Sequence, residues 1–323
     1  MLLHPAIRDA ARACGAPYTG TLQTMDHALY DYSALPTRPR ALWPAGQGLA
    51  AFVVLFLEHW EMSPPADALR DPRMVGEFGS FSPDYRSWSQ REYGLRVGVF
   101  RVIDALQQAG IRPVIAANAM AVQRLPRLVQ TFADWGCEWL GHGISATRML
   151  HSGMPADAQR AHIAQSLAAI EQATGRRAQG WVSQDWGTTP DTAQMLADAG
   201  VRYTLDWSND DQPFWQKTAP PLRAVPLSSE WDDVQCQWLR QLDPRAHAEL
   251  AGAAFERLHQ ECGQQQRSAV YGLGLHPWLC GMPSRIAALR TLLTRLRAPP
   301  GVWWASPSDM MPSPATEPGH GLP

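Results

Sequence analysis

Acidic and imidazole side chains follow several apolar segments of this sequence, where they could transfer protons or bind a metal ion. The candidates are Glu58, His59, Glu61, His142, Asp206 and His276. A carboxylate can accept a proton from water, and a histidine can donate one to a departing group. Carboxylates and imidazoles are also the ligands that catalytic Zn²⁺ prefers. The set therefore indicates acid–base or metal-assisted chemistry.

Two of these candidates compete for one position. Glu58 and Glu61 stand on either side of His59 and Trp60, directly after the apolar run 49–57. Side chains of an extended chain alternate between two faces, so either Glu58 with Trp60 or His59 with Glu61 points inward. Both assignments stay open at this point. We expect one of the two glutamates to act as a base or as a metal ligand.

Polar and aromatic residues at the ends of other segments are candidates for substrate binding. They are Asn118, Trp181, Asp185, Trp207, Asn209 and Asp210. Amide and carboxylate groups can hydrogen-bond the N–H and C=O groups of a small polar ring. Indole rings often form the walls of small-molecule pockets. We expect these residues to surround a small substrate.

Strand and helix patterns alternate along the chain. Predicted strands lie at 50–57, 111–117, 137–140, 179–183, 201–205, 222–227, 269–275 and 302–305. Predicted helices lie at 92–109, 121–135, 157–174, 190–199, 244–261 and 284–296. This order is typical of parallel βαβ units. No Gly-x-Gly-x-x-Gly motif follows a strand, which disfavours a dinucleotide-binding sheet and favours a barrel. The carboxyl ends of barrel strands would gather the candidates at one rim.

The composition excludes several classes of function. The 323 residues include 28 basic and 30 acidic side chains, a net charge of −2 that argues against nucleic acid as a partner. Lys217 is the only lysine, which argues against Schiff-base chemistry. The cysteines are odd in number and form no Cys-x-x-Cys pair, which favours a reducing compartment. No apolar run is long enough to cross a membrane and residues 1–20 lack an apolar signal core, so we expect a cytoplasmic protein.

Several motifs of the sequence resemble those of the polysaccharide deacetylase family with the NodB homology domain. They are Gly141-His142-Gly143, the segment 175–181 that ends in Gly180-Trp181, the segment 206–215 that begins Asp206-Trp207, and Gly274-Leu275-His276-Pro277. The similarity is greatest to the branch that contains PuuE-type allantoinases and cyclic imide hydrolases. It runs from about residue 49 to residue 310.

The resemblance implies an α/β fold, a distorted TIM-like (β/α) barrel of seven to eight parallel strands. We expect the barrel to span 49–311. An N-terminal extension, 1–48, would pack on it, and a disordered tail, 312–323, would follow. The branch forms oligomers, so the resemblance also implies a homo-oligomer, either a dimer or a tetramer.

The sequence departs from the family at the metal ligands. The first motif of the family carries two adjacent aspartates, for which this chain has Glu58-His-Trp-Glu61, with Glu61 the better match to the second. The second motif carries two zinc-binding histidines. His142 matches the first of these, and Ala146 replaces the other. Glu61, His142 and either His59 or His276 could still hold one zinc ion. A metal-free mechanism is the alternative, so the cofactor is expected to be one divalent metal or none.

The activity that the family shares is hydrolysis of amide C–N bonds. We expect Glu61 or Glu58 to activate water and His276 to protonate the leaving nitrogen. Asp206 would orient a histidine. The first hypothesis is a hydrolase of small cyclic amides such as ureides, hydantoins or imides. The alternatives are a metal-dependent N-deacetylase of amino sugars and an inactive barrel that binds a ligand.

Overall fold

The computed structural model describes residues 27–69, 83 and 85–311. The chain divides into two compact units, residues 1–38 and 39–323. In the first unit the described residues include a short 3₁₀ turn, Leu35–Thr37. The predicted tail and residues 1–26 of the predicted N-terminal extension lie outside the described residues. The packing of the extension and the disorder of the tail therefore stay predictions.

The second unit is built on one curled sheet. Its strands are β1 (Leu49–Leu57), β2 (Val114–Ala117), β3 (Glu138–Gly141), β4 (Gly180–Trp181), β5 (Tyr203–Thr204), β6 (Phe214–Gln216), β7 (Leu222–Ala224), β8 (Ala269–Leu275) and β9 (Val302–Trp304). The order is β6-β7-β5-β4-β3-β2-β1-β8, with β9 paired to β1. Every pair is parallel except the antiparallel β6–β7 pair. Eight of the described strands are thus parallel, which confirms the predicted distorted barrel class.

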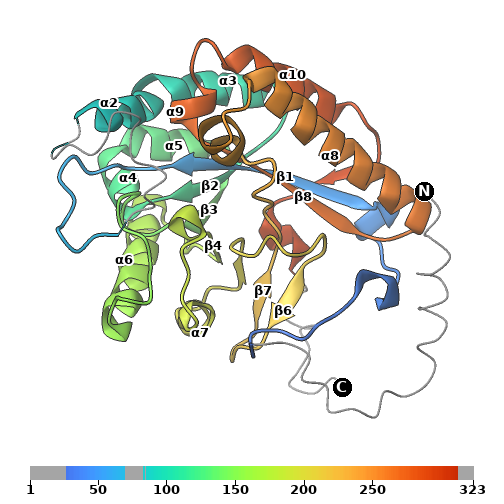
Figure 1. Cartoon of the computed structure of the whole chain (residues 1–323), viewed down its shortest axis with the longest axis horizontal. Helices are drawn as coiled ribbons and strands as arrows, with labels where there is room; N and C mark the ends of the chain where they lie inside the picture. The colour runs from blue at the N-terminus through green and yellow to red at the C-terminus, as the bar shows by residue number, and fades with distance from the viewer. Residues whose placement is uncertain (1–26, 70–82, 84, 312–323) are drawn as a thin grey trace. The chain divides into compact units, whose positions relative to one another are not determined.

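The strand β1 lies next to the edge strand β8 and pairs with three others (Figure 1). Along one edge it pairs with β8, Leu49 opposite Ala269 and Leu55 opposite Leu275. Along the other edge, its first three residues pair with β9 and its last four with β2. The nine apolar residues of β1 are all buried, as the continuous apolar run predicts for a strand inside a parallel sheet.

One strand was not predicted. The strand β6 is only three residues long and follows a polar stretch, so it offers no alternation that a pattern could detect. Just before it, the Asp211 carbonyl accepts a hydrogen bond of 2.8 Å from the backbone N–H of Val270 in β8. The Gln212 side chain donates to the Ser268 carbonyl at 2.7 Å. Among the described strands, β6 and β8 do not pair directly. The sheet is a curled half-barrel, and this segment bridges its two edges.

Helices cover the outer face of the sheet (Figure 1). They are α2 (Tyr85–Tyr93), α3 (Val99–Ala109), α4 (Ala119–Arg124), α5 (Pro126–Asp134), α6 (Ala156–Thr174), α7 (Thr192–Asp198), α8 (Pro244–Gln265), α9 (Pro277–Cys280) and α10 (Ile286–Arg297). A π-helical segment, Gly94–Gly98, joins α2 to α3. The predicted helix 121–135 is divided into α4 and α5 before Pro126, because proline has no N–H to continue a helix. No described helix combines the length and the hydropathy of a membrane span.

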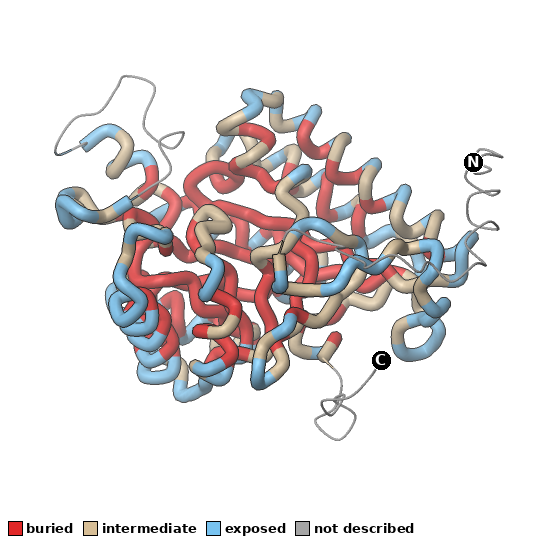
Figure 2. The backbone as a smooth tube through the Cα atoms, turned by 60° about the horizontal axis from the view of Figure 1, so that its bottom comes forward, coloured by how far each residue is buried: buried red, intermediate tan, exposed pale blue. Residues whose placement is uncertain are grey.

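Alternation along β1 decides which side chains reach the inside of the curled sheet. The odd-numbered residues Leu49 to Leu57 pack under the helices, in one apolar cluster. The even-numbered residues Ala50 to Phe56 belong to a second cluster, on the inner side. Figure 2 shows this buried interior as a red core with exposed outer turns around it. The next even-numbered residue, Glu58, continues the inner row and is also buried, with 6% of its surface exposed.

Candidate active site

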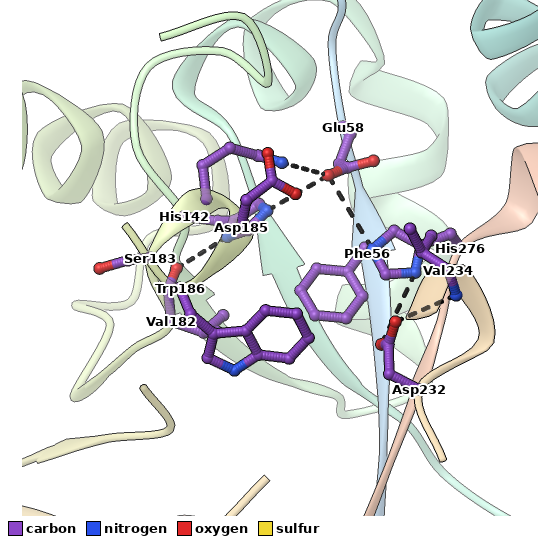
Figure 3. A pocket seen from close by; sticks show the side chains of 11 residues that line it. Phe56, Glu58, His142, Val182, Ser183, Asp185, Trp186, Asp232, Val234 and His276 are labelled. Carbon is purple, nitrogen blue, oxygen red and sulfur yellow. Dashed lines mark hydrogen bonds and ion pairs between the residues drawn. The ribbon is translucent and has the colours of Figure 1, made fainter. Parts of the chain in front are cut away.

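A pocket opens at the carboxyl ends of several strands (Figure 3). It measures about 290 Å³, counted with the solvent at its mouth. Its lining residues are Phe56, Glu58, His142, Val182, Ser183, Gln184, Asp185, Trp186, Asp232, Val234 and His276. They follow or end β1, β3, β4 and β8, or come from the segment after β7. The candidate residues Glu58, His142, Asp185 and His276 are thus brought together at one rim.

Glu58 lies between two histidines of the pocket. Its Oε1 atom is 3.6 Å from Nε2 of His142 and 4.0 Å from Nε2 of His276, one on either side (Figure 3). The Gln184 side-chain amide donates a hydrogen bond of 2.7 Å to the same oxygen. Burial acts to raise the pKa of Glu58, but the charge of His276 and the contact with His142 outweigh it and lower this pKa to about 2. Glu58 is therefore an anion at any physiological pH.

His276 is held from behind by an aspartate. Its Nδ1–H donates to Oδ1 of Asp233 at 2.6 Å, and its backbone N–H donates to Oδ2 at 2.8 Å. Its ring stacks on Phe56 with the centroids 4.2 Å apart. Burial acts to lower the pKa of His276, but the negative charges of Asp233 and Glu58 outweigh it and raise this pKa to about 10. The imidazolium can therefore donate the Nε2 proton into the pocket.

Sequence reasoning missed Asp232, which lines the pocket, and Asp233, which is bonded to His276. Both are fully buried. Oδ1 of Asp232 accepts from the backbone N–H groups of Val234 and Gln235, whereas Oδ2 accepts no hydrogen bond and lies 4.0 Å from Nδ1 of His276. Burial raises the pKa of Asp232 to about 7. Gly274 leaves room for this oxygen, because a Cβ atom there would come within 2.3 Å of it. Two adjacent carboxylates between Trp231 and Val234 were the available signal, but they do not directly follow a strand.

The backbone around His142 fixes its orientation. Its Nδ1–H donates to the Val182 carbonyl at 2.7 Å, which leaves Nε2 directed at Glu58. The Asn118 side-chain N–H donates to the His142 carbonyl, and its Oδ1 accepts from the backbone N–H of His59 at 3.0 Å. Asn118 was predicted to bind substrate. In the structure its amide instead joins the ends of β1 and β3.

Glu61 and His59 point away from the pocket. Glu61 accepts hydrogen bonds from Ser145 (2.6 Å), Thr147 (2.8 Å) and both Nε (2.7 Å) and Nη2 (2.5 Å) of Arg148. Burial acts to raise the pKa of Glu61, but Arg148 and the hydroxyls outweigh it and lower this pKa to about 2. The His59 ring contacts Arg124. Glu61 and His59 belong to the odd-numbered row that follows β1, so the structure does not bring them together with His142 as metal ligands.

Asp206 shapes the pocket wall from outside. It accepts from the backbone N–H of Ser183 (2.5 Å), the Ser183 hydroxyl (2.9 Å) and the Thr204 hydroxyl (2.8 Å). Burial raises its pKa. Asp206 was predicted to orient a histidine, and that role belongs instead to Asp233. Trp181 is fully buried in the core and donates to the Ser183 hydroxyl at 2.8 Å.

Of the other residues predicted to bind substrate, one lines the pocket and three do not. Asp185 lines the pocket. Trp207, Asn209 and Asp210 are not among the lining residues. Asn209 is exposed, and Oδ1 of Asp210 accepts from the backbone N–H of Gln212 at 2.9 Å, as in a turn. The polar segment after β5 therefore serves mainly to reach β6.

The pocket does not offer the zinc ligands that the resemblance implies. Ala146, in place of the second histidine, is fully buried in an apolar cluster with Trp60 and Trp278. Ligand atoms of Asp232, Asp233 and His276 lie within 4.8 Å of one another. Both oxygens of Asp233 and one of Asp232 already accept hydrogen bonds, so this group is organised to orient and charge the imidazole. The donor set does not fit a catalytic zinc centre.

Comparisons with known proteins agree with this fold. No protein-family model matches the chain. A Schizosaccharomyces pombe protein named "Putative polysaccharide deacetylase" is 25% identical over 234 residues, which are 67% of this chain and 72% of that protein. The crystal structure of PuuE allantoinase superposes with a TM-score of 0.75 at 24% identity, over 84% of this chain and 92% of the other.

A second solved structure, a "probable Polysaccharide deacetylase" from Pseudomonas aeruginosa PAO1, gives a TM-score of 0.73 at 24% identity. It covers 84% of this chain and 93% of the other. The sequence motifs, the curled parallel sheet and the rim of acidic and imidazole groups point the same way. The chain thus resembles the polysaccharide deacetylases in sequence, and it has the (β/α) barrel fold that they share with PuuE allantoinase.

Proposed function

We propose that this protein is a hydrolase of amide C–N bonds and that its substrate is a small cyclic amide. The observation that carries the proposal is the pairing of Glu58 with His276 across one pocket, 4.0 Å from Oε1 to Nε2. One group is held as an anion and the other as a proton donor. Titratable groups whose pKa values are driven apart in this way are typical of acid–base sites.

The lining suggests how an amide would be bound. The indole N–H of Trp186 is buried in the pocket without a partner, so it can donate to the carbonyl oxygen of an amide. Glu58 can hold the attacking water. Nε2 of His276 can then protonate the nitrogen as the C–N bond breaks. Phe56 and Trp186 offer flat walls for a ring.

The size of the pocket favours a small substrate. The pocket measures only about 290 Å³ even when the solvent at its mouth is counted. A ureide, hydantoin or imide ring suits this volume better than a polymer does. The second candidate is an N-deacetylase of an amino sugar, which the name of the Schizosaccharomyces pombe relative favours.

Turnover assays test the proposal. Purified protein is given hydantoin, succinimide, allantoin and N-acetylglucosamine oligomers, with ring-opened acid and free acetate measured separately. Metal content is determined, and the assays are repeated after chelation. We expect ring opening by the wild-type protein that survives chelation, and a loss of at least ~10²-fold in His276→Ala. Acetate release without ring opening would favour the deacetylase, and no turnover of any substrate would refute the proposal.

A further inference from the structure

The loop after β4 holds two consecutive residues in a strained conformation. Asp185 has φ 50° and Trp186 has φ 54°, both in the left-handed region that side chains other than glycine rarely adopt. In the rest of the described chain, the non-glycine residues with positive φ are isolated: Ala45, Gln241 and Gln266. Strain of this kind persists where surrounding structure enforces it, and it gathers at functional sites.

The strained turn directs both side chains into the pocket (Figure 3). Oδ2 of Asp185 is buried there and accepts no hydrogen bond, and the indole N–H of Trp186 is likewise buried and unpaired. Leaving a buried carboxylate oxygen without a donor is unfavourable. Asp206, outside the same wall, has hydrogen bonds to both of its oxygens. The free oxygen of Asp185 is therefore placed to bind something that enters the pocket.

The groups that face Asp185 come from three strand ends. They are Glu58 after β1, His142 after β3 and His276 after β8, with Gln184 beside it in the chain. Burial and the charge of Glu58 raise the pKa of Asp185 to about 6, against the opposing effect of the two imidazoles. A general base works best when its pKa is close to the working pH. Glu58, with a pKa of about 2, is a weak proton acceptor by comparison.

We infer that Asp185 is the catalytic residue that takes the proton from the attacking water, an inference that rests on the proposed C–N hydrolysis. The water oxygen bonds to the carbonyl carbon while one of its protons passes to Oδ2 of Asp185. The C–N bond then breaks, and the leaving nitrogen takes the Nε2 proton of His276. The products are the carboxylic acid and the free N–H group. The proton on Asp185 returns through water to His276, which restores both groups.

Two substitutions at Asp185 distinguish its role as a base from its role in the conformation of the turn. Asn is isosteric and tolerates the left-handed conformation, so Asp185→Asn keeps the turn and removes the base. We expect kcat for ring opening to fall by roughly 10²–10⁴-fold. We also expect the wild-type rise of kcat/KM through pH of about 6 to disappear. Asp185→Gly leaves a space, and added formate should restore part of its turnover in proportion to formate concentration.

Stability provides a readout that does not depend on activity. Asp185→Gly releases the strain and the unpaired carboxylate, so its Tm should rise by roughly 2 °C while its turnover is lost. The matched control is Gln266→Gly. Gln266 is an exposed residue with φ 53° at the end of α8, and it is not among the pocket-lining residues. This variant should gain stability from the released strain alone and keep full turnover.

The outcomes distinguish the two proposals. If the wild-type protein opens no ring, the proposed function fails and this inference fails with it. If the wild-type protein is active and Asp185→Asn retains its turnover and its pH profile, only the role of Asp185 is overturned. A loss in both variants without rescue by formate, together with a lower Tm, would assign Asp185 a structural role and would also overturn the inference.

Discussion

Glu58 and Glu61 stand three residues apart at the end of the same strand, and both have a pKa of about 2. Their surroundings differ in kind. Glu61 is bonded to the permanently charged Arg148 and to two hydroxyls, in a closed set of hydrogen bonds. Glu58 faces two imidazoles, which can gain and lose protons, across an open pocket. A low pKa alone therefore does not identify a functional carboxylate. The partners and the neighbouring space do.

This difference arises because the side chains of the two glutamates, which follow β1, point to opposite faces of the sheet. Phe56 and Glu58 are successive inner positions, so Glu58 emerges beside the ring on which His276 stacks. Glu61 falls in the opposite row and meets the segment after β3. A single change of face thus separates a residue of the proposed reaction from a structural ion pair.

The largest expected effect is on turnover. Glu58→Gln removes the anion that faces His276 and should lower kcat by at least ~10²-fold. Glu61→Gln should leave kcat within about 2-fold of the wild-type value at a temperature where both variants are folded, because Glu61 does not line the pocket. A 2-fold change corresponds to less than ~0.5 kcal/mol in the activation barrier. Steady-state assays on matched, folded samples compare them. A large loss in Glu61→Gln with Glu58→Gln active would reverse our assignment of the two glutamates.

The charge of His276 should make the stability of the fold depend on pH on the alkaline side. The pKa of His276 is raised in the folded protein to about 10 from an ordinary 6.5. Its charge therefore stabilises the fold fully below pH 6.5, and this contribution is lost as the pH rises towards 10. We expect the free energy of unfolding to fall by a few kcal/mol over that window. Urea unfolding from pH 6 to 10 measures it, with His276→Gln as a control that should respond less. Equal slopes would refute the assigned charge.

The ion pair of Glu61 should contribute to stability on the acidic side. Its pKa is lowered from 4.5 to about 2, so its contribution is present above pH 4.5 and is lost as the pH falls towards 2. Glu61→Gln should lower the free energy of unfolding by about 2 kcal/mol at neutral pH, because it weakens several hydrogen bonds to a charged group. Glu230→Gln is the matched control. Glu230 pairs with Arg240 at the surface, where such pairs contribute about 0.2–1 kcal/mol. No difference between the two variants would contradict the structural role of Glu61.

Much of the fold could be predicted because it depends on local patterns. The apolar runs identify β1 and β8 with boundaries within a residue, and the residues that follow them identify Glu58 and His276. The choice between Glu58 and Glu61 could not be made, because it depends on how far the extended conformation continues beyond Leu57. The strand β6 was missed because three residues give no period.

The rest of the site depends on contacts distant in the chain. Asp233 and His276 are 43 positions apart in the sequence, and no local pattern predicts the hydrogen bond between them. The left-handed turn at Asp185 is also invisible, because an Asp-Trp pair carries no glycine to indicate positive φ. Residues of this kind are found only when the strands are placed side by side.

The arrangement of β1 has a consequence for biosynthesis. This strand leaves the ribosome before two of its three partners, β8 and β9, which lie more than 200 residues further along the chain. Until those segments are made, a nine-residue apolar strand has only β2 to bond, and its other edge is open to pairing with foreign strands. Such non-local pairing slows folding and prolongs exposure to aggregation. We therefore expect the nascent chain to need protection during synthesis, and Glu58 can meet His276 only after β8 has been made.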